Sequence, residues 1–195
     1  QERWTFHAGD RVWSTPVLAD GLVIVTSLDG NVYGLDAATG ERRWEFAADA
    51  GIAGTPAFDA GWLFVPAMDS RLYALDAETG QALWSFTAGN WFWGTPVVDE
   101  GTLYAASLDG RVYALDAATG AQRWRYDTGA PVRAAPVLVG GTLVVANRAG
   151  RVLVLDPSNG TERQAPVELG ERVLADLVPL DDGTVLIATT KNRLV

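Results

Sequence analysis

Four aspartates repeat along the chain at a fixed spacing, and they are the residues that most resemble a chemical site. Asp36, Asp76, Asp116 and Asp156 stand 40 residues apart, and each is followed four residues later by a glycine. Regularly spaced carboxylates could bind calcium, but a calcium loop needs several oxygen ligands at alternate positions. A segment such as Asp-Ala-Ala-Thr-Gly supplies one carboxylate. We therefore interpret the four aspartates as turn residues.

Other catalytic chemistry has few residues to draw on. The chain has no cysteine, which excludes disulfides, thiolate nucleophiles, iron–sulfur clusters and cysteine zinc sites. Its one histidine, His7, allows no two-histidine metal site, and we interpret it as an incidental surface residue. The sequence thus predicts no catalytic, cofactor-binding or metal-binding residue, and it favours a protein that is not an enzyme.

Composition narrows the class of protein further. The 195 residues are 48% hydrophobic and 20% charged, which argues against intrinsic disorder. No run approaches the roughly 18 apolar residues of a membrane-spanning helix. The formal net charge of -9 disfavours nucleic acid as a partner, because phosphates attract a basic surface.

The positions that could carry function are arranged by a repeat of 40 residues. Tryptophan, proline and glycine each recur at this spacing, at Trp4, Trp44, Trp84 and Trp124, at Pro16, Pro56, Pro96 and Pro136, and at Gly40, Gly80, Gly120 and Gly160. A fifth and weaker copy begins near Gly170. Repeats of this length are typical of solenoids and propellers.

Each repeat contains the signals of four short β-strands, here named A to D. In the first repeat these are residues 15–18, 22–28, 31–35 and 43–47, separated by Asp-Gly turns and by the turn that ends at Gly40. Four antiparallel strands per repeat predict an all-β propeller with one blade per repeat. We predict a single propeller domain over residues 1–195, with blade repeats at about 10–47, 50–87, 90–127, 130–168 and 171–195 and an N-terminal strand at 1–7.

Two ring architectures fit this count. The N-terminal strand, Arg3 to Phe6, has the pattern of a strand D, and the fifth repeat stops inside its strand C. Pairing the two would close a five-bladed ring and remove exposed sheet edges. Alternatively, the five blades form part of a seven- to eight-bladed ring.

The C–D segments carry a family resemblance. Residues 74–84, Ala-Leu-Asp-Ala-Glu-Thr-Gly-Gln-Ala-Leu-Trp, resemble the tryptophan-docking motif of the PQQ repeats found in quinoprotein-type propellers. Residues 114–124 match it equally well, and the first copy departs only at Gly34. The fourth copy is degenerate, with Val154, Asn159 and Gln164 in place of the usual residues. The resemblance covers nearly the whole chain and implies the fold, whereas fold and function are separable.

Two functional classes follow from the resemblance. One is the PQQ-dependent alcohol or glucose dehydrogenases, which bind the quinone with calcium against a disulfide of adjacent cysteines; the absence of cysteine argues against it. The other is non-catalytic scaffolds, such as the BamB-type lipoprotein of bacterial outer-membrane assembly, and cell-surface sensor propellers. The chain looks like the second class, which implies a periplasmic or extracellular location and no cofactor. A fragment of a quinoprotein dehydrogenase is the alternative.

The repeats differ most just before strand A, and this is where a site could be built. One apolar position per repeat is predicted to be core, namely Val12, Ile52, Phe92, Val132 and Val173. Its neighbours alternate with it and therefore point to solvent or to the central channel. They include six aromatic and cationic residues, Arg11, Trp13, Trp91, Trp93, Arg133 and Arg172.

Antiparallel order puts the D–A connections and the B–C hairpins on one face, here called the loop face. The hairpins add more cations to this face, at Arg71, Arg111, Arg148, Arg151 and Lys191, while the A–B turns make the opposite face acidic. Because tryptophan and arginine often anchor interfaces, we expect the loop face to bind a protein or peptide. Two alternatives stay open: the tryptophans plug the axis or pack between blades, or they line a small-molecule pocket.

Overall fold

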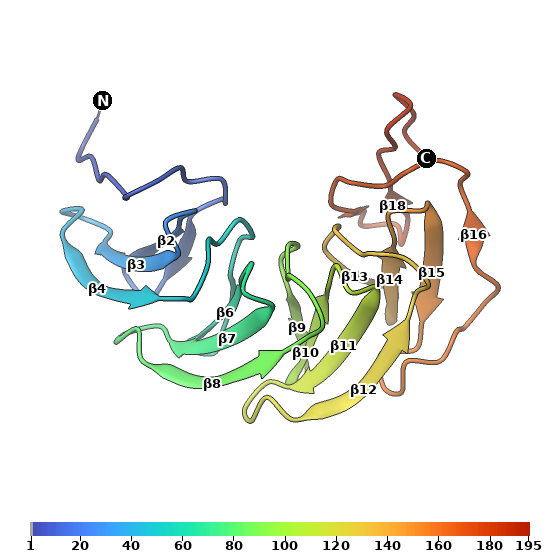
Figure 1. The fold of residues 1–195 in the computed structure, drawn as a ribbon, viewed down its shortest axis with the longest axis horizontal. Coiled ribbons are helices and arrows are strands. Elements are labelled where there is room, and N and C mark those ends of the chain that lie inside the picture. The colour runs from blue at the N-terminus through green and yellow to red at the C-terminus, as the bar shows by residue number, and fades with distance from the viewer. Residues whose placement is uncertain (1) are drawn as a thin grey trace.

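The computed structural model describes residues 2–195 as five antiparallel sheets placed side by side along an open arc (Figure 1). Gln1, the first residue of the predicted N-terminal strand, lies outside the described residues. We call the sheets blades 1 to 5 in chain order. The strands of blade 1 are β1 (Val17–Ala19), β2 (Leu22–Thr26), β3 (Asn31–Asp36) and β4 (Arg42–Ala47). Those of blade 2 are β5 (Ala57–Asp59), β6 (Trp62–Pro66), β7 (Arg71–Asp76) and β8 (Ala82–Thr87).

Blades 3 and 4 repeat this order, and blade 5 is reduced. Blade 3 consists of β9 (Val97–Asp99), β10 (Thr102–Ala106), β11 (Arg111–Asp116) and β12 (Gln122–Asp127). Blade 4 consists of β13 (Val137–Val139), β14 (Thr142–Ala146), β15 (Arg151–Leu155) and β16 (Val167–Glu168), and blade 5 of β17 (Val178–Pro179) and β18 (Val185–Leu186). In each four-stranded sheet the strands lie in sequence order. The predicted all-β fold of four-stranded antiparallel blades is confirmed.

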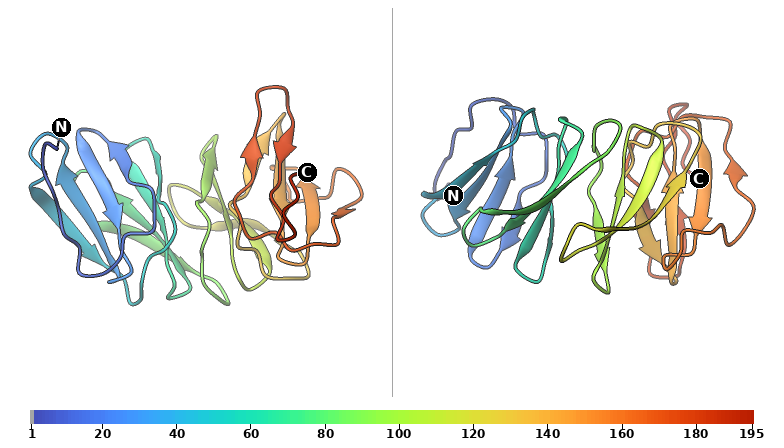
Figure 2. Two further views of the ribbon diagram at one scale, coloured as in Figure 1. Left: turned by 90° about the horizontal axis from the view of Figure 1, so that it is seen from above. Right: turned by 60° about the horizontal axis from the view of Figure 1, so that its bottom comes forward.

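The first strand of each blade lies toward the inside of the arc and the fourth strand toward the outside (Figure 1). Neighbouring first strands are in contact along this inner side, as in the pairs β1 with β5, β5 with β9 and β13 with β17. Figure 2 shows the arc from two further directions, with the sheets following one another along it. Residues just before the first strands therefore gather around the hollow of the arc.

Apolar cores lie between successive blades. Between blades 1 and 2, Ile24 and Val32 pack with Leu63 and Leu75, and the indole of Trp44 closes the cluster. The Nε1 atom of Trp44 donates a hydrogen bond of 3.1 Å to the carbonyl oxygen of Ala77 in the next blade. The same bond recurs at the other two junctions that have a tryptophan, from Trp84 to Ala117 and from Trp124 to Pro157. Each tryptophan of an outer strand thus joins its blade to the next.

Val12 was predicted to be core, and this prediction is wrong. Its counterparts Ile52, Phe92, Val132 and Val173 are at most 1% exposed, whereas Val12 is 43% exposed. Ile52 is buried because it lies between blade 1, where its amide bonds the carbonyl of Ser27, and blade 2. Val12 has no blade before it within residues 2–195 and therefore remains accessible.

The N-terminal segment packs on blade 1 and does not close a ring. Trp4 donates to the carbonyl oxygen of Ala37 at 3.1 Å, and Phe6 lies edge-on to Tyr33 at 4.9 Å between ring centroids. These contacts copy those that Trp44 and Phe46 make with blade 2. Residues 2–7 belong to no strand, because no neighbouring strand pairs with them. Within residues 2–195 no hydrogen bond joins this segment to blade 5, and the arc stays open (Figure 1).

The degenerate fourth motif loosens the junction of blades 4 and 5. Gln164, which replaces the tryptophan, is exposed, and β16 pairs with β15 only at Val167 and Glu168. An apolar groove of about 440 Å³ remains where the indole would lie, lined by Val144 and Val185 among others.

No helix among residues 2–195 is long and apolar enough to cross a membrane.

Candidate interaction face

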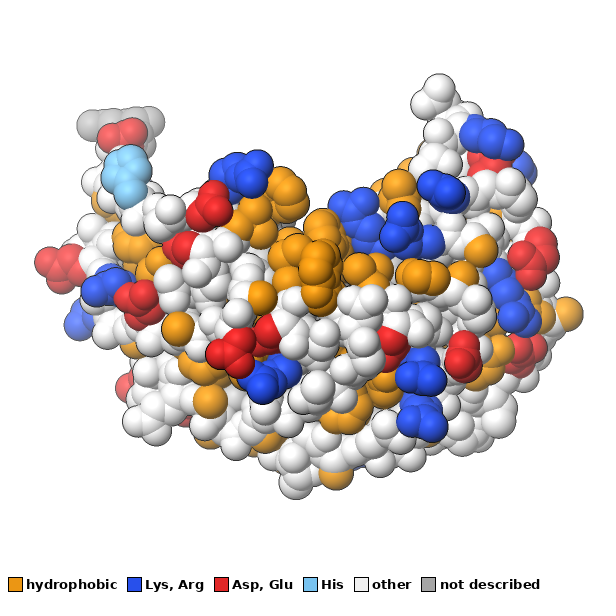
Figure 3. Space-filling view, in the orientation of Figure 1, with side chains coloured by type: hydrophobic (Ala, Val, Ile, Leu, Met, Phe, Trp, Pro, Cys, Tyr) orange, Lys and Arg blue, Asp and Glu red, His pale blue; other side chains and the backbone are white. Residues whose placement is uncertain are grey.

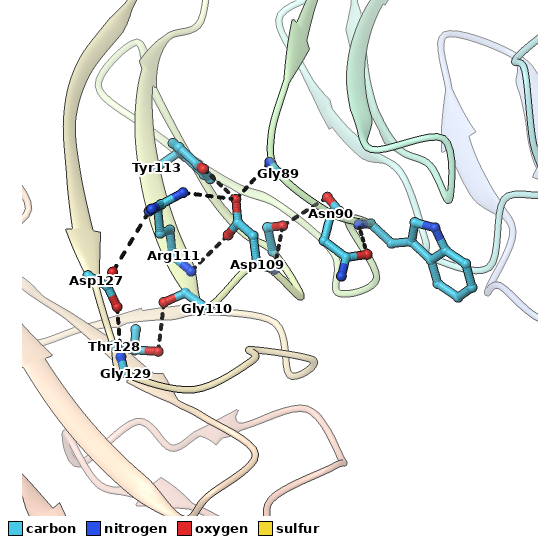
Figure 4. Close-up of polar contacts among 11 residues, drawn as sticks. Gly89, Asn90, Asp109, Gly110, Arg111, Tyr113, Asp127, Thr128 and Gly129 are labelled. Atoms are coloured by element: carbon cyan, nitrogen blue, oxygen red, sulfur yellow. Dashed lines mark hydrogen bonds and ion pairs between the residues drawn. The ribbon is translucent and has the colours of Figure 1, made fainter.

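Hydrogen bonds hold the loop face together by tying each D–A connection to a B–C hairpin. In blade 3, the Oδ2 atom of Asp109 accepts from the amide of Gly89 at 2.8 Å and from the hydroxyl of Tyr113 at 2.6 Å (Figure 4). The other carboxylate oxygen accepts from the amide of Arg111 at 2.9 Å. Asp29 makes the same three kinds of contact in blade 1. The predicted placement of these two loop types on one face is therefore correct.

The same network fixes the loop that carries Trp91. The hydroxyl of Ser107 donates to the carbonyl oxygen of Asn90 at 2.9 Å, and the side-chain oxygen of Asn90 accepts from the amide of Trp91 at 2.8 Å (Figure 4). The amide of Leu108 then donates to the carbonyl oxygen of Trp91. Because the backbone is held on both sides, the Trp91 side chain, 40% exposed, is presented on a rigid loop.

Four of the six predicted site residues come together over the hollow of the arc. The indole rings of Trp13 and Trp93 lie 6.4 Å apart at a tilt of 45°. The guanidinium of Arg133 stacks on Trp93 at 4.4 Å from the ring centroid, and that of Arg11 lies over Trp13 at 5.2 Å. Residues from blades 1, 3 and 4 thus build one cluster, although 120 positions separate Trp13 from Arg133. Cation–π contacts of this geometry attract electrostatically.

This cluster borders a cleft of about 270 Å³, here called the axial cleft. It is lined by one residue from each repeat at the position of Trp13, which gives Ala53, Trp93, Arg133 and Leu174, and by the threonines at the position of Thr15. Arg133 and Trp93 are half-buried, whereas Trp13 is 54% exposed and free to contact a ligand. The remaining two predicted residues, Trp91 and Arg172, are exposed and do not line the axial cleft.

Sequence reasoning missed the polar residues that line the cleft. The amide of Thr15 donates a hydrogen bond of 3.0 Å to the hydroxyl oxygen of Thr55. The amide of Ala135 donates one of 2.7 Å to a carboxylate oxygen of Asp176. These bonds link the starts of neighbouring first strands. The recurrence of threonine at 15, 55 and 95 was a visible signal. Asp176 lies in the degenerate fifth repeat, whose weak alignment with the other repeats did not predict a polar residue at this position.

The charge of the loop face is more localised than the sequence suggested. Arg71 pairs with Asp49, Arg111 lies 3.9 Å from Asp127, and Arg151 lies 3.5 Å from Glu168. These ion pairs neutralise three of the expected cations. Among the described residues no ion pair is found for Arg133, Arg148, Arg172 or Lys191, all of which belong to blades 4 and 5.

The four turn aspartates serve the turns on the opposite face. The carboxylate of Asp36 accepts from the amides of Ala38 and Thr39, both at 3.0 Å, and from Arg43 at 2.8 Å. The bond from Arg43, followed by those from the amides, lowers the pKa of Asp36 to about 2. Arg43 reaches the turn because it is the extra residue of a bulge between β3 and β4. Within residues 2–195 no group of three or more His, Cys, Asp or Glu could hold a metal ion.

The sequence matches the family described as outer membrane protein assembly factor BamB over residues 1–54 and 47–195. The chain belongs to this family. A crystal structure of BamB from Moraxella catarrhalis superposes with a TM-score of 0.85 at 22% identity, covering 98% of this chain and 62% of that one. The computationally designed Ika8 protein superposes with a TM-score of 0.79 at 17% identity, covering 92% and 56%.

These structural likenesses establish the fold alone. The chain spans less than two thirds of either of these solved structures. No curated protein matches the sequence. The family, the propeller fold and the PQQ-type repeat agree with the resemblance that residues 74–84 and 114–124 carry.

The residues of the axial cleft do not fit a calcium-bound quinone. The cleft has one carboxylate, Asp176, and one of its oxygens already accepts the amide of Ala135. The sequence also has no cysteine for the disulfide that stacks on the quinone in the dehydrogenases.

Proposed function

We propose that the protein is a non-catalytic propeller scaffold that binds a protein or peptide on its loop face. The observation that carries the proposal is the cluster of Trp13, Trp93 and Arg133, which comes from three blades and borders the axial cleft. Trp13 is 54% exposed, and neither Trp13 nor Trp93 belongs to an apolar core cluster among residues 2–195, so their contact with a stacked guanidinium favours a binding role. Tryptophan and arginine are also the residues most enriched among those that dominate binding energy.

Family membership supports the same proposal. The matched family is described as an outer membrane protein assembly factor, and this description fits a protein that contacts other proteins. We therefore propose a bacterial protein that works in the periplasm or on the outer side of the cell. We also propose that residues 1–195 act as one propeller unit, since each blade shares a core with the next.

The proposal is tested by selecting ligands first and mapping them afterwards. A phage-displayed random peptide library is panned on the protein, and the affinity of each selected peptide is measured for Trp13→Ala, Trp93→Ala and the double variant. Loss of a well-packed interface aromatic costs about 2 kcal/mol or more, which is at least tenfold in affinity. Trp62→Ala is the matched control, because Trp62 is half-buried and lies outside the axial cleft.

Two results would contradict the proposal. If the selected peptides bind the double variant as well as the original protein, the loop face is not their site. If the double variant instead loses its thermal stability, the tryptophans pack between blades and hold the fold. We expect the stability to change little, because Trp13 is 54% exposed and Trp93, although half-buried, belongs to none of the core clusters among residues 2–195.

A further inference from the structure

The loop face is divided into an apolar and a cationic part. Blades 1 and 3 contribute Trp13, Trp91 and Trp93, while blades 4 and 5 contribute the loop-face cations that form no ion pair within residues 2–195. Figure 3 shows hydrophobic side chains gathered at the middle of the hollowed edge, with Lys and Arg side chains beside them toward the C-terminal blades. A ligand that matches both parts needs an apolar side chain at one end and negative charge at the other.

The same division appears at the tips of the B–C hairpins. Successive hairpins place Leu28, Met68 and Leu108 at a position where blade 4 has Arg148. In all four blades the amide of this residue donates to the D–A connection, so its backbone is equivalent from copy to copy. Only the side chain changes, from apolar and half-buried to charged and exposed. The scaffold does not require this change.

Unpaired arginine is concentrated on this face. Nine of the fourteen arginines form an ion pair within residues 2–195. Three of the other five, Arg133, Arg148 and Arg172, lie in the D–A connections and hairpin of blades 4 and 5. A guanidinium presents a planar fork of donors that matches a carboxylate. Acidic side chains elsewhere on the chain are screened over about 10 Å at ordinary salt, so the local cations decide what binds.

We propose that the loop face recognises an acidic–aromatic peptide segment, and this inference rests on the proposed binding function. The aromatic side chain of the segment packs against Trp13 and Trp93, and its carboxylates pair with Arg133, Arg148 and Arg172. Nucleic acid combines bases with phosphates and is the competing occupant. The net charge of -9 opposes a long polyanion and disfavours it.

The test uses defined fluorescein-labelled peptides and fluorescence anisotropy. The probe carries one Phe followed by three Asp in a background of Gly and Ser. Its matched forms replace Asp by Asn, or Phe by Ala, and a single-stranded oligothymidylate of equal charge represents nucleic acid. We expect the Asp form to bind about tenfold more tightly than the Asn form. This corresponds to about 1.4 kcal/mol from exposed ion pairs acting together.

Variants assign the two halves of the site. Arg133→Gln, Arg148→Gln and Arg172→Gln each weaken binding of the Asp form by about twofold and leave the Asn form unchanged. Trp93→Ala weakens both forms. Arg125→Gln is the matched control, because Arg125 is exposed, forms no ion pair within residues 2–195 and lies on the outer strand β12. It leaves every affinity unchanged.

The outcomes separate this inference from the proposed function. Binding that depends on Trp93 but is equal for the Asp and Asn forms overturns the acidic preference and leaves a peptide-binding face. Tighter binding of the oligothymidylate than of the Asp peptide overturns the choice of partner. Binding that no tryptophan variant affects overturns both the inference and the proposed function.

Discussion

Replacing Gly80 by alanine tests whether the tryptophan contacts between blades hold the arc together. Gly80 has a φ of +71°, and a Cβ atom added there would lie 2.5 Å from Cε3 of Trp44 in the preceding blade. Gly101 has a φ of +70°, but a Cβ atom there would meet nothing within 4 Å. The two positions share the backbone strain and differ in the clash. The difference between Gly80→Ala and Gly101→Ala therefore measures the contact with Trp44.

The structure sets the size of the expected difference. Alanine at a left-handed φ costs about 1 kcal/mol, and this applies to both variants. At Gly80 the indole must also move, yet Trp44 is 8% exposed and its Nε1 atom donates to the carbonyl oxygen of Ala77. Displacing it forfeits part of the roughly 3–5 kcal/mol that a buried aromatic contributes. We expect the free energy of unfolding to fall by about 3 kcal/mol for Gly80→Ala and by about 1 kcal/mol for Gly101→Ala.

Urea unfolding followed by far-ultraviolet circular dichroism measures both losses. The variants are compared with the same slope of unfolding free energy against urea concentration, so that only the midpoints differ. A second background, Trp44→Leu, completes a double-mutant cycle, since there the added methyl has no indole to displace. In that background we expect the loss of unfolding free energy caused by Gly80→Ala to fall to the loss caused by Gly101→Ala. Equal losses for the two glycine variants in the original background would contradict this prediction, because displacing the Trp44 indole would then not lower the free energy of unfolding.

Two further predictions concern the polar contacts of the two faces. Asp109→Ala removes the acceptor of the Gly89 amide and of the Tyr113 hydroxyl, and we expect it to lower the free energy of unfolding by about 2 kcal/mol in urea titrations. The pKa of Asp36 is lowered from 3.8 to about 2, chiefly by Arg43, so its ion pair stabilises the fold above pH 3.8 and is lost as the pH falls toward about 2. The midpoint of thermal unfolding therefore drops over this interval, and less so in Arg43→Gln.

Each of these predictions has a matched control. Asp99→Ala removes an exposed carboxylate that accepts no hydrogen bond from residues 2–195, and it should leave stability unchanged because the backbone pairing of Asp99 with Thr102 is kept. A loss as large as that of Asp109→Ala would show that net charge, and not the hydrogen bonds, sets the effect. For the acid transition, identical pH profiles of the original protein and Arg43→Gln would show that the Asp36–Arg43 pair does not contribute.

The period of 40 residues predicted most of the fold because contacts between blades are themselves periodic. Each outer-strand tryptophan meets the glycine of the next turn, so Trp44 and Gly80 recur together in the sequence. The departure of the first motif copy at Gly34 also has a local reason. A Cβ atom at Gly34 would lie 2.2 Å from the Trp44 ring, so the missing methyl group lets this indole pack more closely. The sequence showed the substitution but not the contact that explains it.

What the sequence could not predict depended on neighbours that the repeat does not encode. Val12 has the residue type of a core position, and its exposure follows from the lack of a preceding blade within residues 2–195. Arg71 and Arg111 were expected to charge the loop face, but acidic side chains on adjacent loops and strands pair with them. The pairing partners differ between copies, so no periodic signal could reveal them.

The scaffold leaves one row of side chains free to vary, and this is why the proposed binding site lies there. At the entry to the first strands of blades 2, 3 and 4, the amide of the buried apolar residue donates to a carbonyl oxygen of the preceding blade, as Ile52 does to Ser27 and Phe92 does to Ala67. The fold needs only the backbone of the residue that follows it, since this position holds Ala53 in blade 2 and Trp93 in blade 3. A position that tolerates alanine in one copy does not need tryptophan in another for folding. We therefore propose that the tryptophans of the axial cleft serve a contact with a partner outside the chain.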